Sequence, residues 1–241
     1  MTEANRISVI IPCLNEDANL VELIPYLQQN GGVMIREIIV VDGGSKDSSI
    51  TVAELLGALV VHSPTCSRAA QLNLGAKHAK GDVFYFVHAD TRPVENYPEA
   101  ILESISLGKE VGCFCYRFDR ESRLLKLNSR FTQFNGLLSG GGDQSLFIKK
   151  SLFEALGGYD ETFCIMEDIE MVSRIRQKSN FHVLSNEMTV SARKYSENSW
   201  LIVQLANLMA FSLFLLKVKP ATIKSLYLNF LNHKNKKYNS S

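Results

Sequence analysis

The stretch GDVFYFVHADTRP (residues 81–93) places an apolar run directly before a polar end. The run VFYFV indicates a buried strand, because strands covered on both faces are continuously apolar. Such strands usually end in a turn built from Gly, Asn or Pro, whereas this one ends in His88 and Asp90. An imidazole and a carboxylate at the carboxyl end of a buried strand point to a site, and the rest of the chain decides its class.

Short β-branched runs alternate with helical patterns through the first half of the chain. Strands are predicted at residues 6–13, 36–43, 58–63 and 82–90, and the helices between them at residues 17–30, 45–57 and 67–81. Strands regularly separated by helices predict right-handed βαβ units. We therefore expect an α/β fold whose mostly parallel, Rossmann-like sheet is covered by helices on both faces.

The second half extends this sheet, because no linker separates the halves. The expected elements are strands at 111–119, 141–150 and 186–195, and helices at 123–138 and 166–179. One domain is predicted over residues 1–198, followed by a C-terminal helical tail over residues 199–241.

The composition excludes several functional classes. Of 241 residues, 46% are hydrophobic and 21% are charged, which is typical of a globular protein with a sizeable core. The formal net charge of +1 gives no support to a nucleic-acid binder, which normally has a basic face. The five cysteines include the pair Cys113 and Cys115 but no second pair near it, so small buried thiols are favoured over zinc ligands. The first residues show no secretory signal, so we expect a cytoplasmic protein.

The tail contains WLIVQLANLMAFSLFLLKV (residues 200–218), which is nearly as long as a membrane span. Gln204, Asn207 and Ser212 interrupt it, so we expect a helix packed on the domain, on a second copy, or on the inner face of the membrane. The lysines that follow, including Lys234 to Lys237, would suit an anionic lipid surface, although a solvated basic tail is the more common case.

Three predicted strands end in polar residues: the first at Asn15-Glu16, the second at Asp42 and the fourth at His88 and Asp90. The carboxyl ends of parallel strands meet at one edge of a sheet, so we expect these side chains to face one crevice. Asp90 is suited to Mg²⁺ or Mn²⁺, which prefer hard oxygen ligands, and Asp42 is suited to accept a hydrogen bond from a nucleotide base. For both aspartates the alternative is a carboxylate that caps a turn.

Glu167 and Asp168 lie at the start of a predicted helix. Acidic residues stabilise a first helical turn, so pairing with the helix dipole is one interpretation. The other is a general base that removes the proton of an acceptor hydroxyl. The chain has neither a GxxxxGK[ST] loop nor a GxGxxG after the first strand, which weakens nucleotide-kinase and dinucleotide-binding interpretations.

Six stretches in register resemble family 2 glycosyltransferases of the GT-A fold: ISVIIPCLNE, EIIVVDGGSKD, SRAAQLNLGAKHAKGD, FVHADTRP, GGGDQSLFIKKSLFEALGGYDETFCIMEDIEM and SARKY. The resemblance is greatest to the bacterial subgroup called rSAM/selenodomain-associated transferase 2, whose members also carry H-A-D-T in place of the more common D-x-D. It spans nearly the whole chain. It implies a metal-dependent, inverting enzyme that moves a sugar from a nucleotide-sugar donor to an acceptor hydroxyl, with a lipid-linked acceptor as one option.

The resemblance also assigns residues. It implies that Asp90 is a ligand of the Mn²⁺ or Mg²⁺ ion and that Asp168 is the catalytic base. His88 replaces the first Asp of the usual motif. The expected donor-binding residues are Pro12, Leu14, Glu16, Asp42, Arg68, His88 and Asp90.

Two departures from the family pattern stand out. Gly43 replaces a second Asp, and no His stands beside Arg193-Lys194, where some relatives place a third metal ligand. These two cations either hold the leaving diphosphate or form a basic strand end.

Two other functions fit parts of the sequence. A nucleotidyltransferase is disfavoured because PCLNEDAN follows the first strand in place of a Gly-rich basic loop. The other alternative is a non-catalytic nucleotide-sugar-binding protein or a membrane-associated scaffold, which the Glu167-Asp168 pair disfavours.

Overall fold

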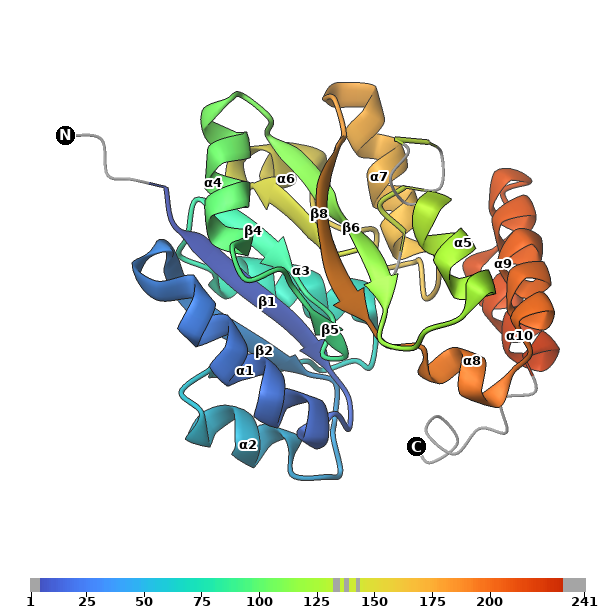
Figure 1. The fold of residues 1–241 in the computed structure, drawn as a ribbon, viewed down its shortest axis with the longest axis horizontal. Coiled ribbons are helices and arrows are strands. Elements are labelled where there is room, and N and C mark those ends of the chain that lie inside the picture. The colour runs from blue at the N-terminus through green and yellow to red at the C-terminus, as the bar shows by residue number, and fades with distance from the viewer. Residues whose placement is uncertain (1–4, 132–134, 137–138, 142–143, 232–241) are drawn as a thin grey trace.

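The computed structural model describes residues 5–131, 135–136, 139–141 and 144–231, and Figure 1 shows how its elements are arranged. Its centre is an eight-stranded sheet with the order β3-β2-β1-β4-β7-β6-β8-β5. The strands are β1 (Ile7–Cys13), β2 (Ile35–Asp42), β3 (Leu59–His62), β4 (Val83–Phe86), β5 (Thr91–Arg92), β6 (Val111–Phe118), β7 (Leu146–Lys149) and β8 (His182–Val190).

Helices cover the sheet and form the C-terminal end of the described chain. They are α1 (Asp17–Gly31), the 3₁₀ turn η1 (Gly32–Met34), α2 (Ser49–Leu55), α3 (Arg68–His78), α4 (Tyr97–Ser106), α5 (Arg123–Phe131), α6 (Lys150–Leu156), α7 (Glu167–Lys178), α8 (Arg193–Glu197), α9 (Trp200–Leu215) and α10 (Pro220–Phe230).

The first half has the predicted parallel topology. Strand β1 pairs in parallel with both β2 and β4, and β2 pairs in parallel with β3. Helices α1, α2 and α3 connect these strands in the predicted order. The α/β fold class, with a mostly parallel sheet, is confirmed for this half of the molecule.

The second half departs from the predicted pattern at several elements. Strand β7 lies antiparallel between β4 and β6, whereas β8 pairs in parallel with β6. Helices α4 and α6 and the two-residue strand β5 were not predicted. The strand expected at 186–195 ends at Val190, and Arg193 and Lys194 begin helix α8, so the basic strand end is wrong. The helix expected at 123–138 ends at Phe131 in the described chain; parts of its second half lie outside the described residues.

Side chains alternate between two cores, one on each face of the sheet. Val9 and Ile11 of β1 join Leu20, Leu23 and other residues from α1, α2 and α4 on one face. Ile10 points to the opposite face, where α3, α6 and α7 contribute the core. Every one of these strand residues is fully buried, as expected for a strand covered on both sides. The buried strands therefore fix where their polar carboxyl ends emerge.

The tail forms a helix pair, α9 and α10, at the end of the molecule opposite α1 and α2 (Figure 1). Gln204 donates to the hydroxyl of Tyr195, Asn207 accepts from the hydroxyl of Tyr227 at 3.0 Å, and Ser212 donates to the carbonyl of Leu208, so all three interrupting polar residues are paired within the protein. Among the described residues, no helix has the length and apolarity needed to cross a membrane. The domain boundary at residues 198 and 199 stays a prediction.

Candidate functional site

Buried hydrogen bonds hold together the carboxyl ends of β1 and β2. The side-chain amide of Gln71, on α3, donates to the carbonyls of Cys13 (2.9 Å) and Val41 (2.7 Å). In the loops that follow, the N–H of Asn15 donates to Ser45 Oγ and the N–H of Lys46 donates to Asn15 Oδ1. The two loops therefore form one rigid unit beside the crevice, as a binding site needs.

Asp42 caps the turn that follows β2. Its carboxylate accepts from the N–H of Gly44 at 2.9 Å and from the N–H of Ser45 at 3.1 and 3.2 Å. Gly44 has a φ of +98°, which favours glycine. The side chain of Asp42 is almost fully buried, so the turn-capping interpretation describes its contacts. Base recognition by Asp42 stays a prediction.

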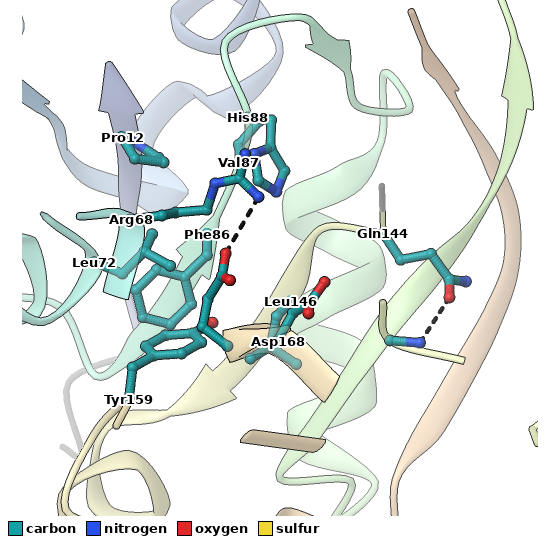
Figure 2. Close-up of a pocket in the computed structure, with 12 residues that line it drawn as sticks. Pro12, Arg68, Leu72, Phe86, Val87, His88, Gln144, Leu146, Tyr159 and Asp168 are labelled. Carbon is teal, nitrogen blue, oxygen red and sulfur yellow. Dashed lines mark hydrogen bonds and ion pairs between the residues drawn. The ribbon is translucent and has the colours of Figure 1, made fainter. Parts of the chain in front are cut away.

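A small pocket lies at the carboxyl edge of the sheet. Four of the predicted site residues, Pro12, Arg68, His88 and Asp168, line this pocket (Figure 2). The other lining residues are Leu72, Phe86, Val87, Gly140, Gln144, Leu146, Tyr159 and Glu167. Leu14, Glu16, Asp42 and Asp90 are not among the lining residues.

The two adjacent acidic residues at the start of α7 have different surroundings. Glu167 is buried, and its Oε1 atom lies 3.2 Å from Nη1 of Arg68. Asp168 is partly exposed and lines the pocket, where Figure 2 shows it on the same cavity as His88. The preceding Met166 has a φ of +64°, an uncommon conformation for a non-glycine residue and one that clusters at functional sites. Glu167 thus positions Arg68, and Asp168 presents its carboxylate to the pocket.

Tyr159 packs beside these two carboxylates. Burial raises the pKa of its hydroxyl well above the usual value, and the charges of Asp168 and Glu167 raise it further. The phenol therefore stays neutral and can donate a hydrogen bond in the pocket.

Arg193, the first residue of α8, joins two strand-end carboxylates that are far apart in sequence. Its guanidinium donates to both oxygens of Glu16, at 3.0 and 3.2 Å. The Nη2 atom also lies 3.1 Å from Oδ2 of Asp90. Glu16 follows β1 and Asp90 follows β4, so one cation closes the edge of the crevice. Lys194 points elsewhere and bonds to the tail, through Asn207 and the hydroxyl of Tyr227.

His88 is exposed to the positive charges of two arginines. Burial, together with the charges of Arg68 and Arg193, lowers the pKa of the imidazole to about 3. His88 is therefore neutral at physiological pH and presents either a lone pair or an N–H to its surroundings.

The protein groups at this edge fit a divalent cation that arrives with a diphosphate. The described residues contain no group of three or more His, Cys, Asp or Glu side chains arranged to hold a metal ion. Asp90 nevertheless offers a carboxylate, and the neutral His88 offers an imidazole lone pair from the same strand end. Mg²⁺ in phosphate sites keeps several waters and takes one or two carboxylates plus phosphate oxygens. One carboxylate with one imidazole is therefore a sufficient contribution from the protein.

Sequence reasoning missed Gln71, Gln144 and Tyr159. Gln144 is buried, accepts from the N–H of Gly140 at 2.7 Å and donates to the carbonyl of Phe114 at 3.0 Å. Gly140 and Gln144 are thereby bonded to each other, and Gln144 to Phe114 of β6, at the wall of the pocket (Figure 2). For Gln71 the available signal was a polar residue flanked by Ala70 and Leu72, because buried amides are kept where they satisfy backbone groups. Gln144 stands between Asp143 and Ser145 and carries no such signal.

Solved structures with this arrangement define the fold class. The chain superposes on residues 1–349 of TarS from S. aureus with a TM-score of 0.63 and 18% identity, covering 94% of this chain and 71% of that one. The mannosyltransferase PcManGT from Pyrobaculum calidifontis, in complex with GDP-Man and Mn²⁺, gives a TM-score of 0.65 at 18% identity over 86% of this chain and 63% of that one. The fold is that of GT-A glycosyltransferases.

The family model "Glycosyl transferase family 2" matches residues 8–166, so the chain belongs to glycosyltransferase family 2. The succinoglycan biosynthesis protein ExoA of Rhizobium meliloti (strain 1021) is 24% identical over 203 residues, which is 75% of this chain and 61% of ExoA. An uncharacterised glycosyltransferase of Haemophilus influenzae is 25% identical over 191 residues, which is 73% of this chain and 63% of that protein. The chain thus spans less than two thirds of either relative.

Proposed function

We propose that this protein transfers a sugar from a nucleotide-sugar donor to an acceptor hydroxyl, with inversion at the anomeric carbon. One observation carries the proposal: a single pocket holds the partly exposed Asp168 together with Arg68 and the neutral His88. A base for the acceptor and cationic or neutral polar groups for the diphosphate are what one displacement requires.

Asp168 acts on the acceptor. Its carboxylate takes the proton of the acceptor hydroxyl as that oxygen forms its bond to the anomeric carbon. The bond from the anomeric carbon to the phosphate oxygen breaks at the same time, and the nucleoside diphosphate leaves with the electron pair. Because attack comes from the face opposite the leaving group, the configuration inverts.

Arg193 and Arg68 act on the leaving group. Arg193 already lies at the strand ends, 3.1 Å from Asp90, and a guanidinium suits bidentate contact with phosphate oxygens. Arg68 is held toward the pocket by Glu167. When bound, a divalent cation would neutralise charge developing on the diphosphate, and Asp90, with His88 beside it, would hold that cation.

The remaining donor contacts belong to the loops after β1 and β2. We assign Pro12, Leu14 and Glu16 to the nucleotide and Asp42 to its base. Related folds have been solved with UDP and UDP-GlcNAc in TarS and with GDP-Man and Mn²⁺ in PcManGT, which supports a nucleotide sugar and Mn²⁺ or Mg²⁺ as the class of ligand. Membership of the rSAM/selenodomain-associated transferase 2 subgroup, contact with the inner face of the membrane and a lipid-linked acceptor stay predictions.

A panel of nucleotide sugars, each with and without Mn²⁺, tests this function. Thermal shift reports binding, because a ligand that binds only the native state raises its stability. Release of nucleoside diphosphate reports turnover in the same samples. Binding with release supports the transferase. Binding of a donor with no release, with or without a membrane lipid extract as acceptor source, would instead favour the non-catalytic nucleotide-sugar-binding alternative.

A further inference from the structure

Helix α9 carries a row of leucines on its outer face. Leu201, Leu205, Leu208 and Leu215 follow the spacing of one helix side, and each is between 45% and 62% exposed. The opposite side buries Val203, Ala206 and Ala210. The described chain therefore covers one side of this apolar helix and leaves its leucine face exposed.

The exposed apolar surface continues into the turn after α9 and into α10. Leu216 is 74% exposed, and Leu226 and Phe230 are each 42% exposed. Half of the strongly exposed large hydrophobic side chains in the described chain lie within residues 200–231. Single exposed leucines need no explanation, but a concentration of them on one element marks an interaction surface.

The positive charge of residues 198–241 favours an anionic lipid surface over a second copy of the chain as the partner. Residues 198–241 contain six lysines and no aspartate or glutamate, in a chain whose formal net charge is only +1. Lys217 and Lys219 are exposed in the turn between α9 and α10, directly beside Leu215 and Leu216. A second copy would bring like charges together, whereas an anionic lipid surface attracts lysines by about 1 kcal/mol each.

The length and internal bonding of α9 favour a helix that lies on the membrane. Sixteen residues of helix span about 24 Å, which is shorter than the hydrocarbon core of about 30 Å. Gln204 and Asn207 bond to tyrosines of α8 and α10, so the helix pair keeps its polar groups satisfied without entering the bilayer. Leucines beside lysines are typical of interfacial helices.

Helix α9 also contacts the segment that leads to the proposed base, through a side other than the one that carries the leucine row. Phe214 of α9 packs edge-on against Phe163, with ring centroids 6.0 Å apart. Phe163 belongs to the segment that leads into α7 and precedes Asp168 by five residues. A lipid surface bound by the outer face of α9 would therefore lie across the helix from the segment that carries the proposed base, about 10 Å away.

We propose that the α9–α10 pair docks peripherally on an anionic lipid surface, with Leu215 and Leu216 in the interface and Lys217 and Lys219 at the lipid phosphates. Resting on the proposed function, this position further implies that the acceptor hydroxyl belongs to a lipid-linked or membrane-bound molecule.

Flotation with vesicles tests the docking without any donor, so its result is independent of catalysis. The full chain is mixed with vesicles of phosphatidylcholine alone or of equal parts phosphatidylcholine and phosphatidylglycerol. We expect binding to the anionic vesicles only, weakened by high salt. Lys217→Gln with Lys219→Gln should weaken binding about 30-fold, from two contributions of about 1 kcal/mol each. Leu215→Gln with Leu216→Gln should abolish it.

A matched control uses leucines of similar exposure elsewhere. Leu55→Gln with Leu107→Gln changes two side chains, 81% and 67% exposed, at the carboxyl ends of α2 and α4, and this variant should bind vesicles like the wild type. Equal flotation of the Leu215/Leu216 variant and the control, with both folded by circular dichroism, would overturn the proposal. So would a wild-type dimer in sedimentation velocity that the Leu215/Leu216 variant dissociates, combined with no vesicle binding.

Discussion

Replacing Arg193 should change metal binding and nucleotide binding in opposite directions. In the donor-free protein the Arg193 guanidinium bonds to Glu16 and lies 3.1 Å from the Asp90 carboxylate. A cation that binds Asp90 must displace this guanidinium and overcome its positive charge. In the donor complex the same guanidinium is free to bond to the diphosphate, where its charge becomes favourable.

The size of the effect on Mn²⁺ binding follows from the exposure of Arg193, and the size of the effect on nucleotide binding follows from the strength of a charge-assisted hydrogen bond. The side chain of Arg193 is 55% exposed, so its ion pair with Asp90 is worth at most about 1 kcal/mol after solvent screening. Arg193→Gln should therefore raise the affinity of the nucleotide-free protein for Mn²⁺ about 5-fold. A charge-assisted hydrogen bond to phosphate contributes about 1.5–3 kcal/mol, so the same change should weaken nucleoside diphosphate binding about 10- to 150-fold.

Two titrations measure these effects: Mn²⁺ alone by electron paramagnetic resonance, and UDP or GDP at saturating Mn²⁺ by calorimetry. Arg117→Gln, which removes an exposed arginine of β6, serves as the control and should leave both affinities unchanged. The reasoning is refuted if Arg193→Gln weakens Mn²⁺ binding to the free protein, or if nucleotide affinity stays at the wild-type value.

The remaining predictions concern the end of β4. Asp90→Ala should lose Mn²⁺-dependent nucleotide binding, and wild-type UDP or GDP affinity at saturating Mn²⁺ would remove Asp90 from the metal site. His88→Asp should keep activity and shift the metal preference toward Mg²⁺, because imidazole suits Mn²⁺ better; an inactive but folded variant would contradict this. In the folded protein the pKa of His88 is about 3, whereas in the unfolded chain it is about 6.5, so only the unfolded chain gains this proton between these pH values. The free energy of unfolding therefore falls as the pH drops below about 6.5. From pH 7 to pH 5, the free energy of unfolding measured in urea should fall by about 1–2 kcal/mol less for His88→Asn than for the wild type, and an equal fall would show that His88 is not the group responsible.

The parallel half of the fold was predictable because its signals are local. Each of β1, β2 and β4 is a short apolar run, and α1 and α3 show helical spacing between them. The direction of β7 was not predictable, since its pairing with β4 and β6 depends on contacts distant in sequence. Strand β5 has two residues and helix α8 has five, which is too short for any periodicity to appear.

The candidate site shows the same limit. Strand-end residues such as His88 and Asp90 were found because parallel strands bring their carboxyl ends together. The local residue pattern alone could not separate Glu167 from Asp168, and the choice of Asp168 came from the family resemblance, because the physical distinction depends on Arg68, which lies 99 residues away and pairs with Glu167. It also could not place Arg193 on Glu16, since these residues are 177 positions apart.

The two acidic residues of α7 provide the most direct test of the proposed mechanism. Asp168→Asn is nearly isosteric, but its amide accepts no proton at neutral pH. Turnover is measured as nucleoside diphosphate release at saturating donor, with donor affinity measured separately by calorimetry. Asp168→Asn should bind donor normally and turn over about 10²- to 10⁴-fold more slowly, whereas Glu167→Gln, which loosens Arg68, should mainly weaken donor binding. Wild-type turnover by Asp168→Asn together with an inactive Glu167→Gln would move the base to Glu167, and full activity of both would contradict general-base catalysis from α7.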